Sequence, residues 1–467
     1  MIKINNIMQI KEFRRFLDDL CYDIVNIFMS GEVNYFYNPW QTFERMKLNL
    51  LALDSKHQIA FKLLLLGEEL DIEMANSVLG EDIIEILLDL CLLVKNSDKV
   101  RTDGYAVVSY FDHYFLVGLP YYYPTSINKD PAVYIAQDTY RLTRVLPSGR
   151  VENSLDLCTG SGIQAILQSR NSYKSFGVEL NSDAIQITKF NVILNNLEDK
   201  VQIKEGDLYE PISSMKFDVI TSNPPFIPVP DNIKFSLAGD GGEDGLKIVR
   251  KIIEGYHAHL NDYGYGIMIG EAIGDERQPF LVDLIKDILG NYFETKLILS
   301  DKKPIESVTK SLATLCTEMG FAQEKNLDKV KSTWSDVSNK LSASYYYVFT
   351  IKTKKLSDKS GRIEVIDITN KWTRSHKPII CSDFVVEKVV NDAYWIKSNN
   401  QYIANLDEEA VDFINLCKGN ITVEEIVTSL SDKYASKYGE EYISKMLVSS
   451  IEACHNLEKK GIIKMGL

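Results

Sequence analysis

Residues 217–226 read Phe-Asp-Val-Ile-Thr-Ser-Asn-Pro-Pro-Phe. The apolar, β-branched start of this stretch predicts a buried strand, and the two prolines end that strand because neither can donate to a ladder. The strand therefore delivers Asn223 to its carboxyl end, where open parallel sheets bind ligands. An Asn carboxamide and the carbonyl of Pro224 can accept hydrogen bonds from an NH2 group, and Phe226 offers a flat face to a planar group. Alone, the stretch also fits an ordinary strand-ending turn.

A Gly-rich turn precedes this strand. Residues 154–164 read Ser-Leu-Asp-Leu-Cys-Thr-Gly-Ser-Gly-Ile-Gln, which predicts a short apolar strand, a turn and a helix. Gly160 and Gly162 let the backbone approach a ligand closely, and the helix presents free N–H groups at its start. The next predicted strand, residues 175–179, ends in Glu179, which can accept hydrogen bonds from ribose hydroxyls.

A third predicted strand, residues 201–208, ends in Asp207 followed by Leu208. Four predicted strands in series thus carry polar groups at their carboxyl ends. Because these ends meet at one edge of a parallel sheet, the sequence predicts a cleft for a nucleotide-type cofactor.

In this order and spacing, residues 156–162, Glu179, residues 206–208 and residues 223–226 resemble the class I S-adenosylmethionine (SAM) methyltransferases. The Asn-Pro-Pro-Phe form resembles the branch that methylates planar nitrogens, which includes release-factor glutamine methyltransferases and adenine or cytosine amino-group methyltransferases. The resemblance implies an α/β fold with a Rossmann-like, doubly wound, seven-stranded core, and SAM as the cofactor. One departure is Cys158-Thr159, where many relatives have Gly-Thr or Gly-Cys, and it should tighten the turn only slightly.

The resemblance also implies roles for the matching residues. The cofactor residues are grouped by the part of SAM that they would touch: Asp156, Gly160 and Gly162 for the methionine part, Glu179 for the ribose, and Asp207 and Leu208 for the adenine. Asn223, together with Pro224 and Phe226, would hold and orient the nitrogen that is methylated. No histidine or glutamate is nominated as a base.

Two segments beside this core also show a resemblance. Residues 133–142 loosely resemble the segment that closes over the cofactor in release-factor methyltransferases, which makes Asp138 and Thr139 candidates for the amino-acid end of SAM. The same residues also fit an ordinary helix start. Residues 236–247 form a Gly-rich acidic loop that resembles the loop bordering the acceptor site, and its glycines would allow it to move as a lid.

Composition narrows the class of partner. The chain has 467 residues, of which 45% are apolar, and this predicts a soluble protein with sizeable cores. A net charge of −13 disfavours bulk binding to nucleic acid. The seven scattered cysteines fit reduced thiols in the cytoplasm, and no metal framework is visible. Neither a signal-peptide pattern nor an apolar run of about 20 residues occurs, so no membrane span is expected.

Flanking regions predict accessory domains on both sides of a methyltransferase domain at residues 131–354. Residues 1–130 predict a helical and winged-helix domain. Its candidate recognition helix, residues 83–90, lies among acidic side chains, which favours substrate capture or packing over reading of duplex DNA. Residues 304–341 predict an inserted helix, and the basic stretch at residues 352–377 marks a domain junction.

The last predicted domain covers residues 355–467. Residues 406–419 and 422–430 resemble PqqD-like domains, the leader-peptide recognition modules of ribosomal peptide modification systems. In that family a peptide adds as a strand to the edge of a small sheet. A small winged helix that serves packing or dimerisation fits the same residues.

Three functions remain open. The first is N-methylation of a planar or amine nitrogen in a peptide or protein, for example in a peptide natural product, and the acidic charge and PqqD-like tail favour it. The second is methylation of an RNA or DNA base, for which the basic junction could supply binding. The third is a non-catalytic SAM-binding scaffold, which the intact motif at residues 223–226 disfavours because a scaffold needs no acceptor clamp. The oligomeric state is not predicted.

Overall fold

The computed structural model describes residues 2–24, 39–120, 123–127, 130–321, 326–369, 376–381, 384–390, 393–398, 401–438 and 442–466. The chain forms two compact units, Met1–Asp367 and Ile368–Leu467. Among the described residues, no helix is long and apolar enough to cross a membrane.

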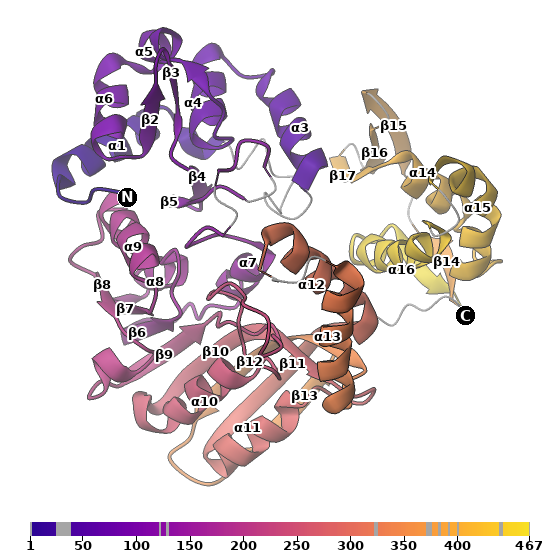
Figure 1. Ribbon diagram of the computed structural model, residues 1–467. Coiled ribbons are helices and arrows are strands. Elements are labelled where there is room, and N and C mark those ends of the chain that lie inside the picture. Colours follow the sequence, from indigo (N-terminus) through magenta and orange to yellow (C-terminus); the bar gives the residue numbers. More distant parts are fainter. Residues whose placement is uncertain are drawn as a thin grey trace. The chain divides into compact units, whose positions relative to one another are not determined.

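The first unit is built on an eight-stranded sheet with the order β13-β11-β12-β10-β9-β6-β7-β8 (Figure 1). Its strands are β6 (Val151–Leu157), β7 (Ser172–Glu179), β8 (Val201–Glu205), β9 (Phe217–Ser222), β10 (Leu260–Gly274), β11 (Phe293–Pro304), β12 (Tyr345–Lys355) and β13 (Ile363–Asp367). Strands β6 to β10 run parallel, and β12 runs antiparallel to both β10 and β11. The chain winds outward from β6 to β8 and then returns to β9 on the other side of β6. This reversal is a topological switch point, where doubly wound sheets bind ligands.

Helices on the two sides of this sheet belong to separate hydrophobic clusters. Helices α8 (Ile163–Gln168) and α9 (Ser182–Leu194) contribute to one cluster. Helices α10 (Lys247–His259) and α11 (Leu281–Leu289) contribute to another, together with core residues of β6, β9 and β10. The predicted α/β, Rossmann-like class is therefore confirmed.

Two details differ from the sequence prediction. The sheet has one strand more than the predicted seven, because β13 pairs in parallel with β11 from Thr295↔Ile363 to Leu299↔Asp367. The apolar alternation in Ile-Glu-Val-Ile-Asp is short and lies within a basic stretch, so charge obscured it in the sequence. The predicted inserted helix is instead a pair of helices, α12 (Ile305–Met319) and α13 (Leu327–Lys340), that contact each other.

The N-terminal region shares its core with the sheet domain. It contains α1 (Ile7–Asp19), α3 (Pro39–Leu50), α4 (Ser55–Leu64), α5 (Ile72–Leu79) and α6 (Glu81–Asp89), the sheet β1-β3-β2 (Leu70–Asp71, Lys99–Thr102, Leu93–Asn96) and the hairpin of β4 (Tyr105–Tyr110) and β5 (His113–Gly118). Strand β1 lies between α4 and α5, and β2 and β3 follow α6. The winged-helix assignment stays a prediction. One hydrophobic cluster extends from Ile2 in this region to Val201 in β8.

Asn191 of α9 and Asn195, the residue that caps the end of α9, satisfy the outer edge of β5. Asn191 Oδ1 accepts from Leu116 N (2.7 Å), and its Nδ2 donates to Leu116 O (3.0 Å). Asn195 pairs in the same way with N and O of Tyr114, at 3.0 and 2.7 Å. Asn191 and Asn195 are four residues apart, which is a rise of about 6 Å along a helix. Tyr114 and Leu116 are two residues apart, which is about 6.6 Å along a strand. The two carboxamides are therefore spaced to bond to both strand residues. Helix α9 therefore replaces a neighbouring strand.

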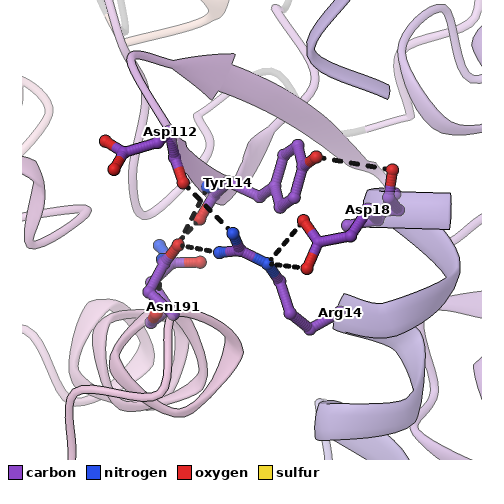
Figure 2. Close-up of polar contacts among 7 residues, drawn as sticks. Arg14, Asp18, Asp112, Tyr114 and Asn191 are labelled. Atoms are coloured by element: carbon purple, nitrogen blue, oxygen red, sulfur yellow. Dashed lines mark hydrogen bonds and ion pairs between the residues drawn. The ribbon is translucent and has the colours of Figure 1, made fainter. Parts of the chain in front are cut away.

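Figure 2 shows how α1 joins this junction. Arg14 donates from Nε to Asp18 (2.9 and 3.0 Å) and from Nη1 to Asn195 Oδ1 (2.9 Å). Its Nη2 donates to the carbonyl oxygen of Asp112 (3.2 Å), and its guanidinium lies 4.5 Å from the ring centroid of Tyr114. One cation thus ties α1, the β4–β5 turn and α9 together.

The described residues of the second unit form two small sheets and three helices. Its elements are β14 (Lys377–Ile380), which pairs with β18 (Ile463–Gly466), the meander β15 (Val385–Val390), β16 (Ala393–Ser398) and β17 (Gln401–Leu406), and helices α14 (Glu408–Leu416), α15 (Val423–Tyr438) and α16 (Tyr442–Lys459). A capping box opens α15: Glu425 N donates to Thr422 Oγ1 (3.2 Å), and Thr422 N donates to Glu425 Oε2 (2.7 Å). The unit begins at Ile368, thirteen residues after the predicted boundary at residue 355, because β13 belongs to the first unit. The PqqD-like resemblance stays a prediction.

Candidate active site

A cavity of about 160 Å³ lies at the carboxyl ends of β6, β7, β8 and β9. Six of the predicted site residues line it, namely Thr139, Gly160, Glu179, Asp207, Leu208 and Asn223. Five others lie behind or beside the lining, namely Asp138, Asp156, Gly162, Pro224 and Phe226. The lining also includes polar residues that sequence reasoning missed, among them Ser161, Gln164, Asn181 and Asp240.

The Gly-rich turn after β6 shapes the cavity floor. Cys158, Gly160 and Gly162 all have positive φ, at 57°, 53° and 80°. A Cβ on Gly160 would meet no atom within 4 Å, so this glycine leaves space open at the cavity. A Cβ on Gly162 would lie 2.6 Å from Thr188 Cγ2, so this glycine lets the turn pack on α9. The backbone here fits close approach by a ligand.

Asp156 ties this turn to β9 from behind. Its carboxylate is almost fully buried and accepts from Thr159 Oγ1 (2.6 Å) and Thr221 Oγ1 (2.8 Å). Burial raises the pKa of Asp156 to about 7. The sequence analysis expected this residue to border the cofactor, whereas the structure places it among the threonines that fix the turn.

Glu179 faces the cavity and also holds the turn. Its Oε2 accepts from Gly160 N (2.9 Å), and its Oε1 accepts from Leu180 N and Asn181 N (both 3.0 Å). A carboxylate has about four acceptor sites, so roughly one remains free on Oε2. A ribose hydroxyl can use that site, and a second hydroxyl would displace a backbone contact.

Asp207 and Leu208 follow β8 on the next side of the cavity. Asp207 Oδ2 pairs with Lys251 Nζ from α10 at 3.0 Å. Leu208 is buried and has a φ of 50°. The two residues thus place one polar and one apolar side chain beside the cavity. This pair suits an adenine ring, which has flat apolar faces and polar edges.

Asn223 extends from the end of β9 towards α7 (Gln137–Thr143). Its Nδ2 donates to Asp138 Oδ2 at 2.9 Å. Because a carboxylate only accepts, the NH2 group must face Asp138 and Oδ1 must face away. Within the part of the chain that the structure describes, Oδ1 is buried and has no hydrogen-bond partner. Asn223 therefore lines the cavity and carries an acceptor atom that the described residues leave unsatisfied.

The Gly-rich acidic loop is fixed to the residues that follow the motif. Ile227 N donates to Gly239 O and Gly241 N donates to Ile227 O, both at 2.9 Å. A Cβ on Gly241 would lie 2.8 Å from Phe226 Cα, so only glycine allows this approach. Glu243 is also paired with Lys340 of α13. The loop that the sequence analysis interpreted as a lid is thus braced in this structure.

Similarity to known proteins identifies the family. The model of the methyltransferase small domain matches residues 127–272. A relative from Methanocaldococcus jannaschii carries the provisional name protein N5-glutamine methyltransferase. It is 30% identical over 154 residues, which cover 32% of this chain and 77% of that protein. The chain belongs to the methyltransferase small domain family.

Two further relatives carry substrate names. A ribosomal protein uL3 glutamine methyltransferase of Bradyrhizobium diazoefficiens is 35% identical over 145 residues, which cover 28% of this chain and 45% of that protein. A release factor glutamine methyltransferase of Aquifex aeolicus is 31% identical over 169 residues, which cover 32% of this chain and 59% of that protein. The chain spans about half the length of the first curated relatives that it matches, at 45% and 46%. Family and relatives together imply SAM as the methyl donor, and the open turn and the Glu179 carboxylate fit that cofactor.

Asp156→Asn should change how stability depends on pH. Because the folded pKa lies near 7 and an unfolded Asp titrates near 3.9, the parent loses stability as pH rises through that window, by up to about 1.4 kcal/mol per unit. The Asn variant does not ionise at this position. The free energy of unfolding of the variant minus that of the parent should therefore rise from pH 4 to pH 7. Urea unfolding of the ligand-free proteins measures this, and a constant difference would contradict the assigned pKa.

Glu179→Ala should weaken SAM binding, because it removes a charged acceptor worth about 1.5–3 kcal/mol per hydrogen bond. The control is Glu205→Ala, since Glu205 is the exposed register partner of Glu179 on β8 and does not line the cavity. Calorimetry should show a raised dissociation constant for the first variant alone. Equal affinity in both variants would mean that β7 does not contact the cofactor.

Proposed function

We propose that the protein is a SAM-dependent N-methyltransferase that acts on a side-chain amide of a protein or peptide. The observation that carries the proposal is the buried Oδ1 of the cavity-lining Asn223, which has no hydrogen-bond partner among the described residues. An acceptor atom in this position suits a substrate that brings an NH2 group. The names of the relatives, which are glutamine methyltransferases, support an amide nitrogen as the acceptor.

Bound SAM supplies a methyl group activated on a sulfonium. Asn223 Oδ1 and the Pro224 carbonyl would accept hydrogen bonds from the two hydrogens of the acceptor amide, which fixes its plane. The Phe226 ring would cover that plane. Methyl transfer would form an N–C bond as the C–S bond breaks and leaves its electron pair on sulfur, and the nitrogen would then release one proton to water. No strong base is needed, because the methylated nitrogen is cationic before it loses that proton.

A finer proposal is that the substrate is a short peptide modified in natural-product biosynthesis. Its support is the second unit, in which β15 forms the edge of the described β15-β16-β17 sheet. An added peptide strand could use that edge for main-chain hydrogen bonds. The exposed side chain of Val385 on β15, 60% accessible, would contact such a strand.

Nucleic acid is a weaker candidate for the acceptor. Helix α6, where a winged helix would read duplex DNA, exposes Glu81, Asp82 and Glu85. These carboxylates would repel phosphates. A scaffold role is also weaker, because it gives no reason for an unsatisfied acceptor on Asn223.

Asn223→Ala should abolish most methyl transfer and leave SAM affinity unchanged. Misplacement of a reacting atom by about 1 Å can cost on the order of 100-fold in rate, and the variant removes the group that positions the nitrogen. Asn223→Asp should keep partial activity, because a carboxylate still accepts from NH2. Single-turnover transfer from labelled SAM to protein, peptide and RNA pools measures the rates, and calorimetry measures the affinity.

Equal transfer by the parent and Asn223→Ala would contradict the amide-clamp mechanism. An absence of transfer from the parent to any pool would favour the scaffold.

A further inference from the structure

Asp138 lies in the first turn of α7 and contacts the acceptor clamp rather than the cavity. Its Oδ1 accepts from Thr139 N (2.8 Å), and its Oδ2 accepts from Asn223 Nδ2 (2.9 Å). Helix α7 is held at two further points. Gln164 Nε2 donates to Thr139 O (3.2 Å), and Arg141 Nη2 donates to Gly270 O (3.3 Å). The carboxylate is therefore a fixed feature beside Asn223.

A carboxamide has two orientations of nearly equal shape. Rotation by about 180° exchanges its oxygen and its NH2 group. In one orientation Asn223 offers Oδ1 to an incoming amide. In the other it offers NH2, and two NH2 groups cannot hydrogen-bond productively to each other. Shape alone does not select the productive orientation.

We propose that Asp138 is the positioning residue that selects it. A carboxylate can only accept, so Asp138 bonds to Asn223 in the single orientation that leaves Oδ1, unpartnered among the described residues, to accept from an acceptor amide. The inference rests on the proposed amide methylation and goes beyond the assignment of Asp138 to the cofactor that the sequence suggested. This orientation would favour an acceptor that carries NH hydrogens, because Asn223 would then offer an oxygen and not an NH2 group.

The negative charge adds a second effect. A hydrogen bond to an ionised acceptor is stronger than a neutral one, and it polarises the group that donates it. Electron density shifts towards Oδ1 of Asn223. That oxygen then stabilises the positive charge that develops on the acceptor nitrogen as the N–C bond forms.

Asp138→Asn is the most direct variant, because it keeps the shape and removes both the charge and the selectivity. An asparagine at position 138 can bond to either orientation of Asn223. We expect the single-turnover rate to fall roughly 10- to 100-fold, with SAM affinity within about twofold of the parent. Asp138→Glu keeps a carboxylate and should recover part of the rate.

A second change should partly reverse the first. A carboxylate at position 223 has two equivalent oxygens, so orientation no longer matters, and an asparagine at 138 can donate to it. The double variant Asp138→Asn with Asn223→Asp should therefore transfer methyl groups at least about tenfold faster than Asp138→Asn alone. A merely structural role for Asp138 predicts no such rescue.

The chain offers a matched control at the other end of the same strand. Asp218 accepts from Asn261 Nδ2 (2.8 Å) and from the backbone of Glu152 (2.9 Å) and Asn153 (3.1 Å). Asp218→Asn breaks a comparable carboxylate–carboxamide pair far along β9 from Asn223. It should lower the melting temperature and leave the single-turnover rate unchanged.

The outcomes separate this inference from the proposed function. If the parent transfers methyl groups to protein and Asp138→Asn does so at the same rate, the inference is wrong and amide methylation stands. If Asp138→Asn loses SAM affinity in proportion to rate, Asp138 belongs to the cofactor site and the inference is again wrong. If the parent transfers nothing to protein or peptide, the proposed function falls and the inference falls with it.

Discussion

The acceptor site depends on one hydrogen bond between side chains that are 85 positions apart in the chain, from Asn223 Nδ2 to Asp138 Oδ2. Two constraints make this bond possible. Prolines end β9 abruptly, so Asn223 lies just past the carboxyl end of this strand and takes no part in the hydrogen bonding between strands. Anchored at both sides, α7 holds Asp138 against that edge. The result is a buried oxygen that finds no partner within the described ranges. Such an oxygen is costly without a ligand and useful where a substrate donates to it.

On the cofactor side of the cavity, a few side chains hold the Gly-rich turn in place. Glu179 faces the cavity and also accepts from Gly160 N, while Asp156 holds the turn through Thr159. Asn191 extends this bracing, because its Nδ2 donates to the carbonyl of Ser161 as well as to β5. The turn is therefore fixed from the sheet and from the N-terminal region at once, before any ligand arrives.

Sequence alone predicted the sheet class and the residues that line much of the cavity, because strand-ending motifs report directly on one sheet edge. It could not predict the partner of Asp138, since that contact depends on how α7 docks. It could not predict that Asp156 bonds to Thr159 and Thr221, because a carboxylate at a strand end looks the same in the sequence whether it faces a ligand or a threonine. Strand β13 was missed because its five residues lie in a basic stretch, where charge hid the alternation.

The measurement that tests the central claim most directly is the identity of the methylated atom. Protein, peptide and RNA from cells lacking this protein can be incubated with the purified chain and isotopically labelled SAM, and the product mapped by mass spectrometry. The account predicts a single labelled methyl on the side-chain amide nitrogen of a protein or peptide. A short precursor peptide as the acceptor would support the natural-product proposal, and a ribosomal or release-factor protein would contradict that finer proposal. A label on a nucleic acid base would contradict the account.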